Sequence, residues 1–467
     1  MKRTAFALTA LAATGILLAS CSASAGAADA GSSETTARAF TGDLSPEEVL
    51  AANSDYTTVN DDEWSADDAV DVALDGSTAE ASGDGVSVDG STVTVTAAGV
   101  YRLSGSLEGA VVVEAPEDAQ VVLILDGAEI SNADGPAIEV RTADDVAINL
   151  ASGSENTVSD AASYAEDATV NAAIDASSDL TISGDGSLTV TGNGNDGISS
   201  TDDLVVLAGR ITVSAADDAL RGKDALVVEG GELDLTATAG DGLKSDQEEN
   251  ETQGYVLVSG GTIGIAAGDD GIQALTDVVI TGGDTTIDAA DHGLEGESIL
   301  TIGGGTITVT ASNEGMQAIS VGIFDGTIDL MAVDDGINAS GINAGGQERE
   351  TDTGERLEIS GGTITIDAGF DGLDSNGSVT VSGGDVTISS AENGGDNPID
   401  ANGTATVAEG VVVANGEAFD SDSIQQMPGG PRMGGGEPGE GRQGTGEMPG
   451  GGEMPAPTDA PDADRAS

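Results

Sequence analysis

The chain is poor in basic residues. Its 467 residues include 14 Lys and Arg against 83 Asp and Glu, which gives a formal net charge of −69. Binding to nucleic acid depends on neutralising phosphates with Lys and Arg, and this composition cannot supply that charge. The balance therefore excludes a nucleic-acid-binding protein, and it argues against direct attraction to anionic lipid headgroups.

Aromatic residues are also scarce, at 2% of the chain, although hydrophobic residues make up 38%. Glycine is abundant, with 70 residues. A core of Val, Ile, Leu and Ala with frequent Gly predicts many short strands joined by tight turns, because β-branched residues suit strands and Gly permits close turns.

There is one cysteine, Cys21, so an intramolecular disulfide and a thiolate metal cluster are excluded. Residues 1–20 combine a basic start with an apolar run, as in a signal peptide, and LASC (18–21) resembles the bacterial lipoprotein signal. We expect Cys21 to be lipidated and the protein to be extracytoplasmic, at the cell surface, and held to the membrane by its lipid alone. An ordinary secretory signal with an unrelated Cys is the alternative.

Composition divides the rest of the chain into four segments. Residues 21–45 are small and polar, as in a flexible tether, and residues 46–83 form a cap or linker with a short helix at 46–50. Residues 84–420 consist of short segments in which β-branched residues alternate with others, and Gly, Asp and Asn separate these segments. Residues 421–467 are rich in Gly, Pro and Met, a composition that cannot bury a core and predicts disorder.

The central segment is a repeat. One half of the unit is strand, Gly-Gly, strand, as in LVVEGGELDL (226–235) and LEISGGTITID (357–367), and the other half is an acidic turn such as DDGIQ (269–273). The second turn position falls at residues 196, 218, 241, 270, 292, 314, 335 and 371. Removing the polar inserts that lengthen two of the steps restores a unit of about 22 residues.

A period near 22 with short strands predicts an all-β fold, a single-stranded right-handed parallel β-helix with about 22 residues per coil and disordered N- and C-terminal tails. In residues 357–367, Leu357, Ile359, Ile364 and Ile366 can all face inward and stack on the next coil about 4.8 Å away. The residue pattern of a leucine-rich repeat is absent from this sequence, and a β-propeller blade would need about 40 residues.

The repeated turn and strand motif, with the upstream run AGVYRLSG (98–105) and the element VVLILDGAEISNADGPAIEV (121–140), resembles the carbohydrate-binding β-helix family of bacterial cell-surface proteins. The resemblance covers about residues 84–415. It implies a fold similar to that of pectate lyases, bound calcium, and binding of plant-wall polysaccharides, including cellulose and acidic pectic sugars.

The acidic turns are candidate Ca²⁺ ligands. In a coiled fold they stack about 5 Å apart, and each neighbouring pair of carboxylates then repels by about 3 kcal/mol at an effective dielectric of 20. Hard oxygen ligands from adjacent turns suit Ca²⁺, which would relieve this repulsion. The candidate metal ligands are Asp217, Asp218, Asp241, Asp269, Asp270, Asp291, Glu295, Asp334, Asp335, Asn338, Asp371 and Asp374.

The acids could also be present for reasons unrelated to a metal. Asp-Gly is ordinary turn chemistry, in which the carboxylate accepts nearby backbone N–H groups, and acid-rich surfaces also arise by salt adaptation. The residue type at the outward-facing position after each acidic turn varies. This variation is typical either of a strip that faces a ligand or of one that faces solvent. Its candidate ligand-binding residues are Arg221, Lys244, Gln273 and Gln317.

We therefore expect a calcium-dependent, polysaccharide-binding, monomeric lipoprotein without catalytic activity. The first alternative is a pectate or uronate lyase, for which Arg221, Lys223 and Lys244 on neighbouring turns are the one cluster of bases, although charge compensation also explains them. The second alternative is a structural adhesin without a glycan ligand. A Ser–His–Asp triad is not credible with the single His292, and exposed aromatics for sugar stacking are few.

Overall fold

The computed structural model describes residues 41–165, 168–341, 352–391 and 397–424. The predicted signal peptide at 1–20, Cys21, most of the tether and nearly all of the C-terminal tail lie outside these ranges. So does Asp396, which follows residue 371 as a ninth acid of the predicted turn series.

The described chain is almost entirely strand. It contains 36 strands, two short helices, α1 (Pro46–Leu50) and α2 (Ser421–Ile424), and one 3₁₀ turn, η1 (Ala66–Asp68). The helix expected at 46–50 is α1. Most strand pairs are parallel, so the prediction of an all-β, parallel-strand fold is confirmed. In the described ranges no helix has the length and apolar character needed to cross a membrane.

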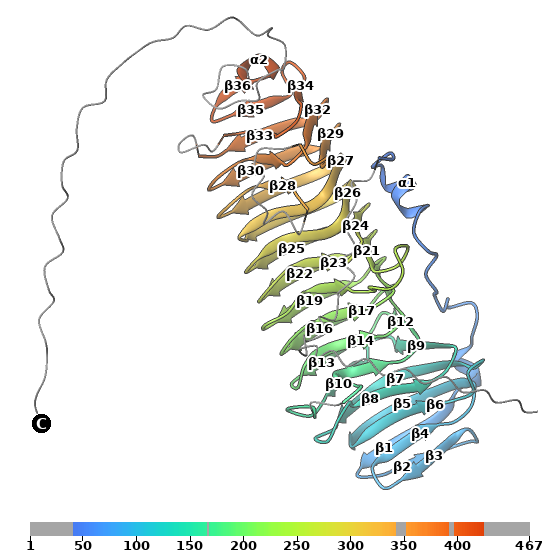
Figure 1. Ribbon diagram of the computed structural model, residues 1–467. Helices are drawn as coiled ribbons and strands as arrows, with labels where there is room; N and C mark the ends of the chain where they lie inside the picture. The colour runs from blue at the N-terminus through green and yellow to red at the C-terminus, as the bar shows by residue number, and fades with distance from the viewer. Residues whose placement is uncertain (1–40, 166–167, 342–351, 392–396, 425–467) are drawn as a thin grey trace, which may run out of the picture.

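The strands form an elongated stack and lie across its long axis one above another (Figure 1). Their pairing sorts them into three series, which are the three faces of the stack. Face 1 consists of β4 (Thr92–Val95), β6 (Ala110–Glu114), β8 (Ile138–Thr142), β11 (Ala172–Ala176), β14 (Asp196–Ser200), β17 (Leu220–Gly222), β20 (Leu243–Ser245), β23 (Ile272–Ala274), β28 (Ile337–Ala339) and β31 (Leu373–Ser375).

Face 2 consists of β1 (Val70–Gly76), β5 (Gly99–Glu108), β7 (Gln120–Ser131), β9 (Asp145–Leu150), β12 (Asp179–Gly184), β15 (Asp203–Val206), β18 (Ala225–Val228), β21 (Tyr255–Val258), β24 (Asp277–Ile280), β29 (Arg356–Ile359), β32 (Ser378–Val381) and β34 (Ala405–Val407).

Face 3 consists of β10 (Glu155–Ser159), β13 (Ser187–Gly192), β16 (Arg210–Ala215), β19 (Glu232–Ala237), β22 (Thr262–Ala267), β25 (Asp284–Ala289), β30 (Thr363–Ala368), β33 (Asp385–Ser389) and β35 (Val412–Ala414). Two long strands, β26 (His292–Ala311) and β27 (Glu314–Ala332), run through all three faces.

Each strand pairs with the equivalent strand one turn of chain later. On face 1, for example, Ile198 pairs with Leu220 and Leu220 pairs with Leu243. The chain therefore winds in successive turns, and the sequence repeat is one turn of this winding. The insert at 246–254 loops out between β20 and β21, so that the register of Leu243 with Ile272 is kept.

The core is a continuous column of aliphatic side chains inside the stack. Leu357, Ile359, Ile364 and Ile366 are at most 1% exposed, as the alternation in that unit predicts. Equivalent side chains stack in every turn, so the inward side of each strand is removed from water and the outward side is left for polar residues.

Antiparallel hairpins close both ends of the stack. β1 pairs with β2 (Ala79–Ala81) and β4 pairs with β3 (Val86–Asp89) at one end, while β35 pairs with β36 (Glu417–Phe419) at the other. Strand structure thus begins at Val70 and not at residue 84 as predicted, because the alternating segment VDVAL pairs with β5 although it lacks the Gly-Gly signature of the repeat. The hairpins protect backbone edges that an open stack would expose.

Residues 44–64, here called the strap, run back along face 2 instead of only capping one end. Leu44 and Val49 are 0% exposed and pack on outward side chains of face 2, among them Val227 and Val279. The strap also donates backbone N–H groups from Thr57 to Asp203 Oδ2 at 2.8 Å and from Val59 to Thr181 Oγ1 at 3.0 Å. It therefore covers an apolar strip that would otherwise meet water.

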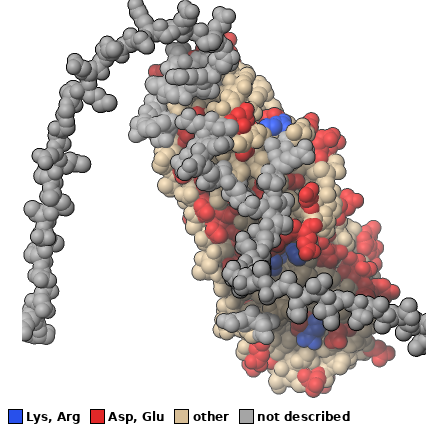
Figure 2. Space-filling view, viewed as in Figure 1, with Lys and Arg blue, Asp and Glu red and all other residues tan. Residues whose placement is uncertain are grey.

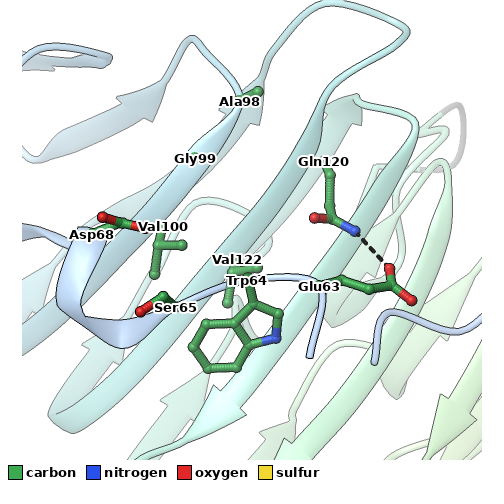
Figure 3. Close-up of a pocket in the computed structure, with 9 residues that line it drawn as sticks. All are labelled: Glu63, Trp64, Ser65, Asp68, Ala98, Gly99, Val100, Gln120 and Val122. Atoms are coloured by element: carbon green, nitrogen blue, oxygen red, sulfur yellow. Dashed lines mark hydrogen bonds between the residues drawn. The ribbon is translucent and has the colours of Figure 1, made fainter. Parts of the chain in front are cut away.

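The strap ends at Trp64, which packs on Val100 and Val122 beside a shallow hollow of about 370 Å³. Figure 3 shows the indole ring lying against the sheet, with the Glu63 carboxylate accepting a 3.2 Å hydrogen bond from Gln120 at the rim. Because the ring is half-buried against face 2, we assign Trp64 to anchoring the strap.

Leu44→Ala should loosen the strap. Removing a fully buried Leu side chain costs about 2–5 kcal/mol, and this cost falls on a segment held by few other apolar anchors. We expect faster hydrogen exchange at the Ser54 and Thr57 amides, measured by mass spectrometry or NMR. Glu47→Ala, at an exposed position of α1, is the matched control and should leave exchange unchanged. Equal protection in both variants would mean that Leu44 is no anchor.

Candidate functional site

The second turn positions form a single row along the edge of face 1, here called the acid row. Its members in the described residues are Asp196, Asp218, Asp241, Asp270, His292, Glu314, Asp335 and Asp371. The first four Asp side chains are only 1%, 4%, 0% and 3% exposed. The row is thus in register, its first four members are buried, and the other four are half-buried.

A repeated hydrogen bond explains this burial. One carboxylate oxygen of each Asp accepts the backbone N–H of the next member of the row. The Asp241 N–H donates to Asp218 at 2.9 Å, the Asp270 N–H to Asp241 at 2.9 Å, and the His292 N–H to Asp270 at 2.8 Å. The bond recurs from Asp371 N–H to Asp335 at 2.8 Å. Each Asp therefore accepts a hydrogen bond from a backbone N–H of the next turn. An uncharged side-chain acceptor could make the same bond, so the bond by itself does not require a carboxylate.

A second row, the polar strip, runs beside the acid row on the outer side of face 1. Consecutive strand pairs hold its members in register from turn to turn. These members are Glu139, Asp175, Ser199, Arg221, Lys244, Gln273, Glu295, Gln317, Asn338 and Asp374. The predicted ligand-binding residues Arg221, Lys244, Gln273 and Gln317 all lie in this strip.

In the middle of the two rows, basic side chains of the chain itself pair with the carboxylates. Lys244 Nζ lies 2.7 Å from Asp241 Oδ2 and 3.4 Å from Asp218. Arg221 pairs with Asp246, in the insert, at 2.7 Å. Burial acts to lower the pKa of Lys244, but the charge of Asp218 and the hydrogen bond with Asp241 raise it overall. These two predicted ligand residues are therefore engaged with carboxylates of the same chain.

His292 extends this internal pairing by one turn. Its Nδ1 lies 2.9 Å from Asp270 Oδ1, and Asp270, His292 and Glu295 bring ligand atoms within 4.8 Å of one another. Burial acts to lower the pKa of His292, but Asp270, Glu295 and Asp291 raise it to about 9. Next to it, the amides of Gln273 and Gln317 donate to Glu295 at 3.2 and 3.1 Å.

The C-terminal part of the rows has a different composition. Asp371, Asp374 and Asp400 place carboxylate oxygens within 4.8 Å of one another, and Asn338 stands in register with Asp374. Burial and neighbouring carboxylates raise the pKa of Asp335 to about 8 and that of Asp374 to about 7. No described cation is among the main causes of either shift. We call Glu314, Asp335, Asn338, Asp371, Asp374 and Asp400 the C-terminal acid group.

One atom of this group is buried without a hydrogen-bond partner. The Asn338 Nδ2 donates to Glu314 Oε2 at 3.1 Å, but Asn338 Oδ1 has no donor among the described residues, and the side chain is only 9% exposed. A buried amide oxygen without a donor is costly unless something else binds it.

The acids that precede the row occupy more exposed positions. Asp217 joins Asp196 and Asp218 in one close group, and Asp269 joins Asp270 and Asp291 in another. Asp334 lies beside Asp335, whose pKa its charge helps to raise after burial and the nearer carboxylates. The structure thus brings the predicted metal ligands together in several groups along the row, not in one.

Sequence reasoning missed a further acid group on face 2. Asp179, Asp202 and Asp203 bring oxygens within 4.8 Å, and burial first and neighbouring carboxylates next raise the pKa values of Asp202 and Asp203 to about 7. The Asp203 N–H donates to Asp179 Oδ1 at 3.1 Å, as in the acid row. The recurring Asp before the apolar runs DLTIS and DLVVL was the available signal. Asp400 was missed as well, although the bridge of Ile399 with Leu373 places it in line with Asp374.

Acidic side chains outnumber basic ones on the visible surface of the stack, and Lys and Arg appear only in isolated places there (Figure 2). Of the aromatic residues that fall in the described ranges, Tyr101, Tyr255 and Phe419 are buried, Tyr56, Trp64, Tyr164 and Phe324 are half-buried, and Phe370 is exposed. Most aromatic side chains therefore serve packing, as expected.

Comparison with known proteins identifies relatives of this chain. A family model described as "carbohydrate-binding domain-containing protein" matches residues 89–293 and 288–430. A protein of that description from Acetivibrio thermocellus is 33% identical over 200 residues, which cover 42% of this chain and 70% of the relative.

A solved structure also aligns with part of the stack. It is described as the polysaccharide lyase-like protein from C. thermocellum, gadolinium derivative, and shares 34% sequence identity. The alignment covers 51% of this chain and 93% of the other, with a TM-score of 0.46.

Stability should fall as the pH rises in buffer freed of divalent ions. Burial first, and the charge of Asp218 next, raise the pKa of Asp196 from 3.8 to about 8. The folded protein therefore holds more protons than the unfolded chain between these values, so the free energy of unfolding decreases across this window. His292 acts in the same direction, because its folded pKa is also raised.

Asp196→Asn isolates this effect. The Asn oxygen can still accept the Asp218 N–H, but the side chain cannot ionise. We expect the variant to unfold on the order of 2 °C above the parent at pH 8, and with no difference at acidic pH, measured by thermal unfolding. Asp234→Asn removes an exposed carboxylate and serves as the control. An unchanged pH slope in Asp196→Asn would contradict the assigned shift.

Proposed function

The chain belongs to the family of carbohydrate-binding domain-containing proteins, and we propose that it is a non-catalytic, calcium-dependent polysaccharide-binding protein of the cell surface. The polar strip beside the acid row is the proposed glycan-binding surface, with an acidic pectic glycan or cellulose as the ligand. The winding would be that of a right-handed parallel β-helix, as the repeat length predicts.

The spacing of the strip supports a glycan lying along the stack. Neighbouring parallel strands are about 4.8 Å apart, which is close to the length of one sugar residue in an extended polysaccharide. A chain laid along face 1 would then meet one polar side chain per turn. Side-chain amides and carboxylates, such as those of Gln273, Glu295 and Gln317, are suitable partners for sugar hydroxyls.

The buried, unpartnered Asn338 Oδ1 is the observation on which the calcium proposal rests. An amide oxygen surrounded by carboxylates is a donor set that fits Ca²⁺, which takes six to eight oxygen ligands. The C-terminal acid group would hold the ion, and the ion would supply the positive charge that Asp335 and Asp374 do not receive from any described Lys, Arg or His.

The middle of the rows fits a cation less well. Lys244 already lies between Asp218 and Asp241, and His292 is paired with Asp270. A divalent ion there would have to compete with these groups. Of the twelve candidate ligands from the sequence, we therefore place the ion at Asp335, Asn338, Asp371 and Asp374, with Glu314 and Asp400 as additional ligands.

A bound Ca²⁺ would also explain how so acidic a protein can hold an acidic glycan, because a protein carboxylate and a uronate carboxylate can share one ion. Without the ion, the net charge of −69 would repel a polyanion. The proposal therefore makes acidic-glycan binding dependent on calcium and leaves neutral glycan binding less so.

The lyase alternative is disfavoured by the state of the basic residues. A proton-abstracting base must be unprotonated, whereas neighbouring carboxylates raise the pKa values of Arg221 and Lys244 and raise that of His292 to about 9. These residues are suited to charge compensation.

We further propose that lipidated Cys21 anchors the protein as a monomer outside the cytoplasm.

Chelation should lower the thermal midpoint of the protein. An ion that binds the native state alone stabilises it by about 2.7 kcal/mol when its free concentration is 100 times Kd. Asp374→Asn should weaken Ca²⁺ binding at least tenfold by calorimetry. Asp329→Asn removes the same charge from an exposed site on face 3 and should leave the affinity unchanged. Equal affinities in the two variants would remove the C-terminal acid group as the binding site.

Binding to insoluble glycans tests the function itself. We expect retention on polygalacturonate with Ca²⁺ and loss of that retention with chelator, measured by pull-down and densitometry. Retention on cellulose should change less. Absence of retention on both materials in both conditions would reject the carbohydrate proposal, and growth of ultraviolet absorbance from unsaturated products would instead support a lyase.

A further inference from the structure

Exposed large apolar side chains are concentrated at one end of the stack. In the described residues they are Met331, Val333, Phe370 and Val413, with exposures of 54%, 70%, 46% and 40%. All four lie in the last turns, although the repeat offers equivalent surface positions along the whole stack. Phe370 is also the exposed aromatic of the described chain.

Three of these residues lie close together on two successive turns. Met331 and Val333 are two residues apart at the end of β27, and both are exposed while Ala332 between them is buried. Phe370 lies on the following turn, where its N–H donates to Asp334 O at 3.1 Å, directly beside Val333. A Cβ at Gly369 would come within 2.0 Å of Val333 O, so only glycine lets the two turns approach this closely.

Phe370 occupies a turn position that is polar or Gly in the other turns. The equivalent residue, one before the acid row, is Asn195, Asp217, Gly240, Asp269, Asp291, Asn313 or Asp334. Packing does not explain the aromatic ring, because it is half exposed and outside the core. It directly precedes Asp371 of the C-terminal acid group.

We propose that Phe370, Val333 and Met331 form a stacking subsite for the C–H face of one pyranose ring, next to the C-terminal acid group. This inference rests on the proposed polysaccharide binding and adds the place where one sugar of the chain is held. The ring would pack on the apolar cluster, while the neighbouring carboxylates face its hydroxyls or a bound ion.

Charge favours a glycan over other occupants of this patch. A second copy of the chain brings another acidic surface of the same sign, and the patch itself is bordered by Asp334, Asp367 and Asp371. An acidic protein or an anionic membrane would be repelled for the same reason. A neutral sugar ring has an apolar face and an uncharged polar edge, which match an aromatic side chain set among carboxylates. A uronate ring would in addition need the bound Ca²⁺ of the proposed function to offset its carboxylate.

Affinity for soluble oligosaccharides tests this subsite. Calorimetry with oligogalacturonide and with a cello-oligosaccharide, both in Ca²⁺, should give affinities on the order of 3- to 10-fold weaker for Phe370→Ala than for the parent. Phe370→Trp should retain or exceed the parent affinity, because it keeps a stacking ring. Val413→Ala removes an exposed apolar side chain on a later turn of face 3 and should leave the affinity unchanged.

The outcomes separate this inference from the function on which it rests. If the parent binds glycan and Phe370→Ala binds equally well, the subsite is wrong and the polysaccharide-binding function stands. If the parent binds no glycan, both fail. Ca²⁺ affinity, titrated without glycan, should be the same in the parent and in Phe370→Ala. If sedimentation shows a dimer that Phe370→Ala dissociates, the patch is an interface between copies and the proposal is overturned.

Discussion

The hydrogen bond between a carboxylate and the N–H of the next turn is the interaction on which this acidic stack depends. It fixes one oxygen of each Asp of the row to the backbone, as between Asp218 and the Asp241 N–H. Each such bond satisfies a buried backbone donor and holds two turns in register. The acids are therefore structural first, and their second oxygens are left to bind whatever cation or donor lies alongside.

Stacking carboxylates in a row makes them repel one another, and the groups that surround them differ along the stack. In the middle, Lys244 and His292 lie within hydrogen-bond distance of the row, so the carboxylates there are neutralised from within. Towards the C-terminal end no ion pair among the described residues involves Asp335 or Asp374, and burial first and neighbouring carboxylates next raise the pKa values of both. A proton or a bound metal ion would each offset the repulsion among these carboxylates.

The sequence was sufficient for the periodic features and insufficient for the others. Local alternation identified Ile364 and Ile366 as inward, and the spacing of the acidic turns placed the row in register, because both follow from a repeat of constant length. The strap could not be foreseen, since Val59 meets Thr181 and Leu44 meets Thr301 across more than a hundred residues with no periodic relation. Nor does composition reveal that Lys244, a predicted ligand residue, turns towards Asp241.

The same internal pairing limits where a ligand can bind. In the middle of the polar strip, the amides of Gln273 and Gln317 both donate to Glu295, so a sugar hydroxyl would have to displace a bond already made. At the C-terminal end, Asn338 Oδ1 has no donor among the described residues and Phe370 is exposed, so both offer groups whose interactions are incomplete, although Asp246 Oδ1 beside the middle of the strip is likewise buried without a described donor. Affinity arises where the free protein leaves interactions unmade, because satisfied groups gain little on binding. The repeat thus supplies a uniform scaffold, and two departures from it among the described residues, acids without an ion pair and an added aromatic, are the features to which the proposal assigns recognition.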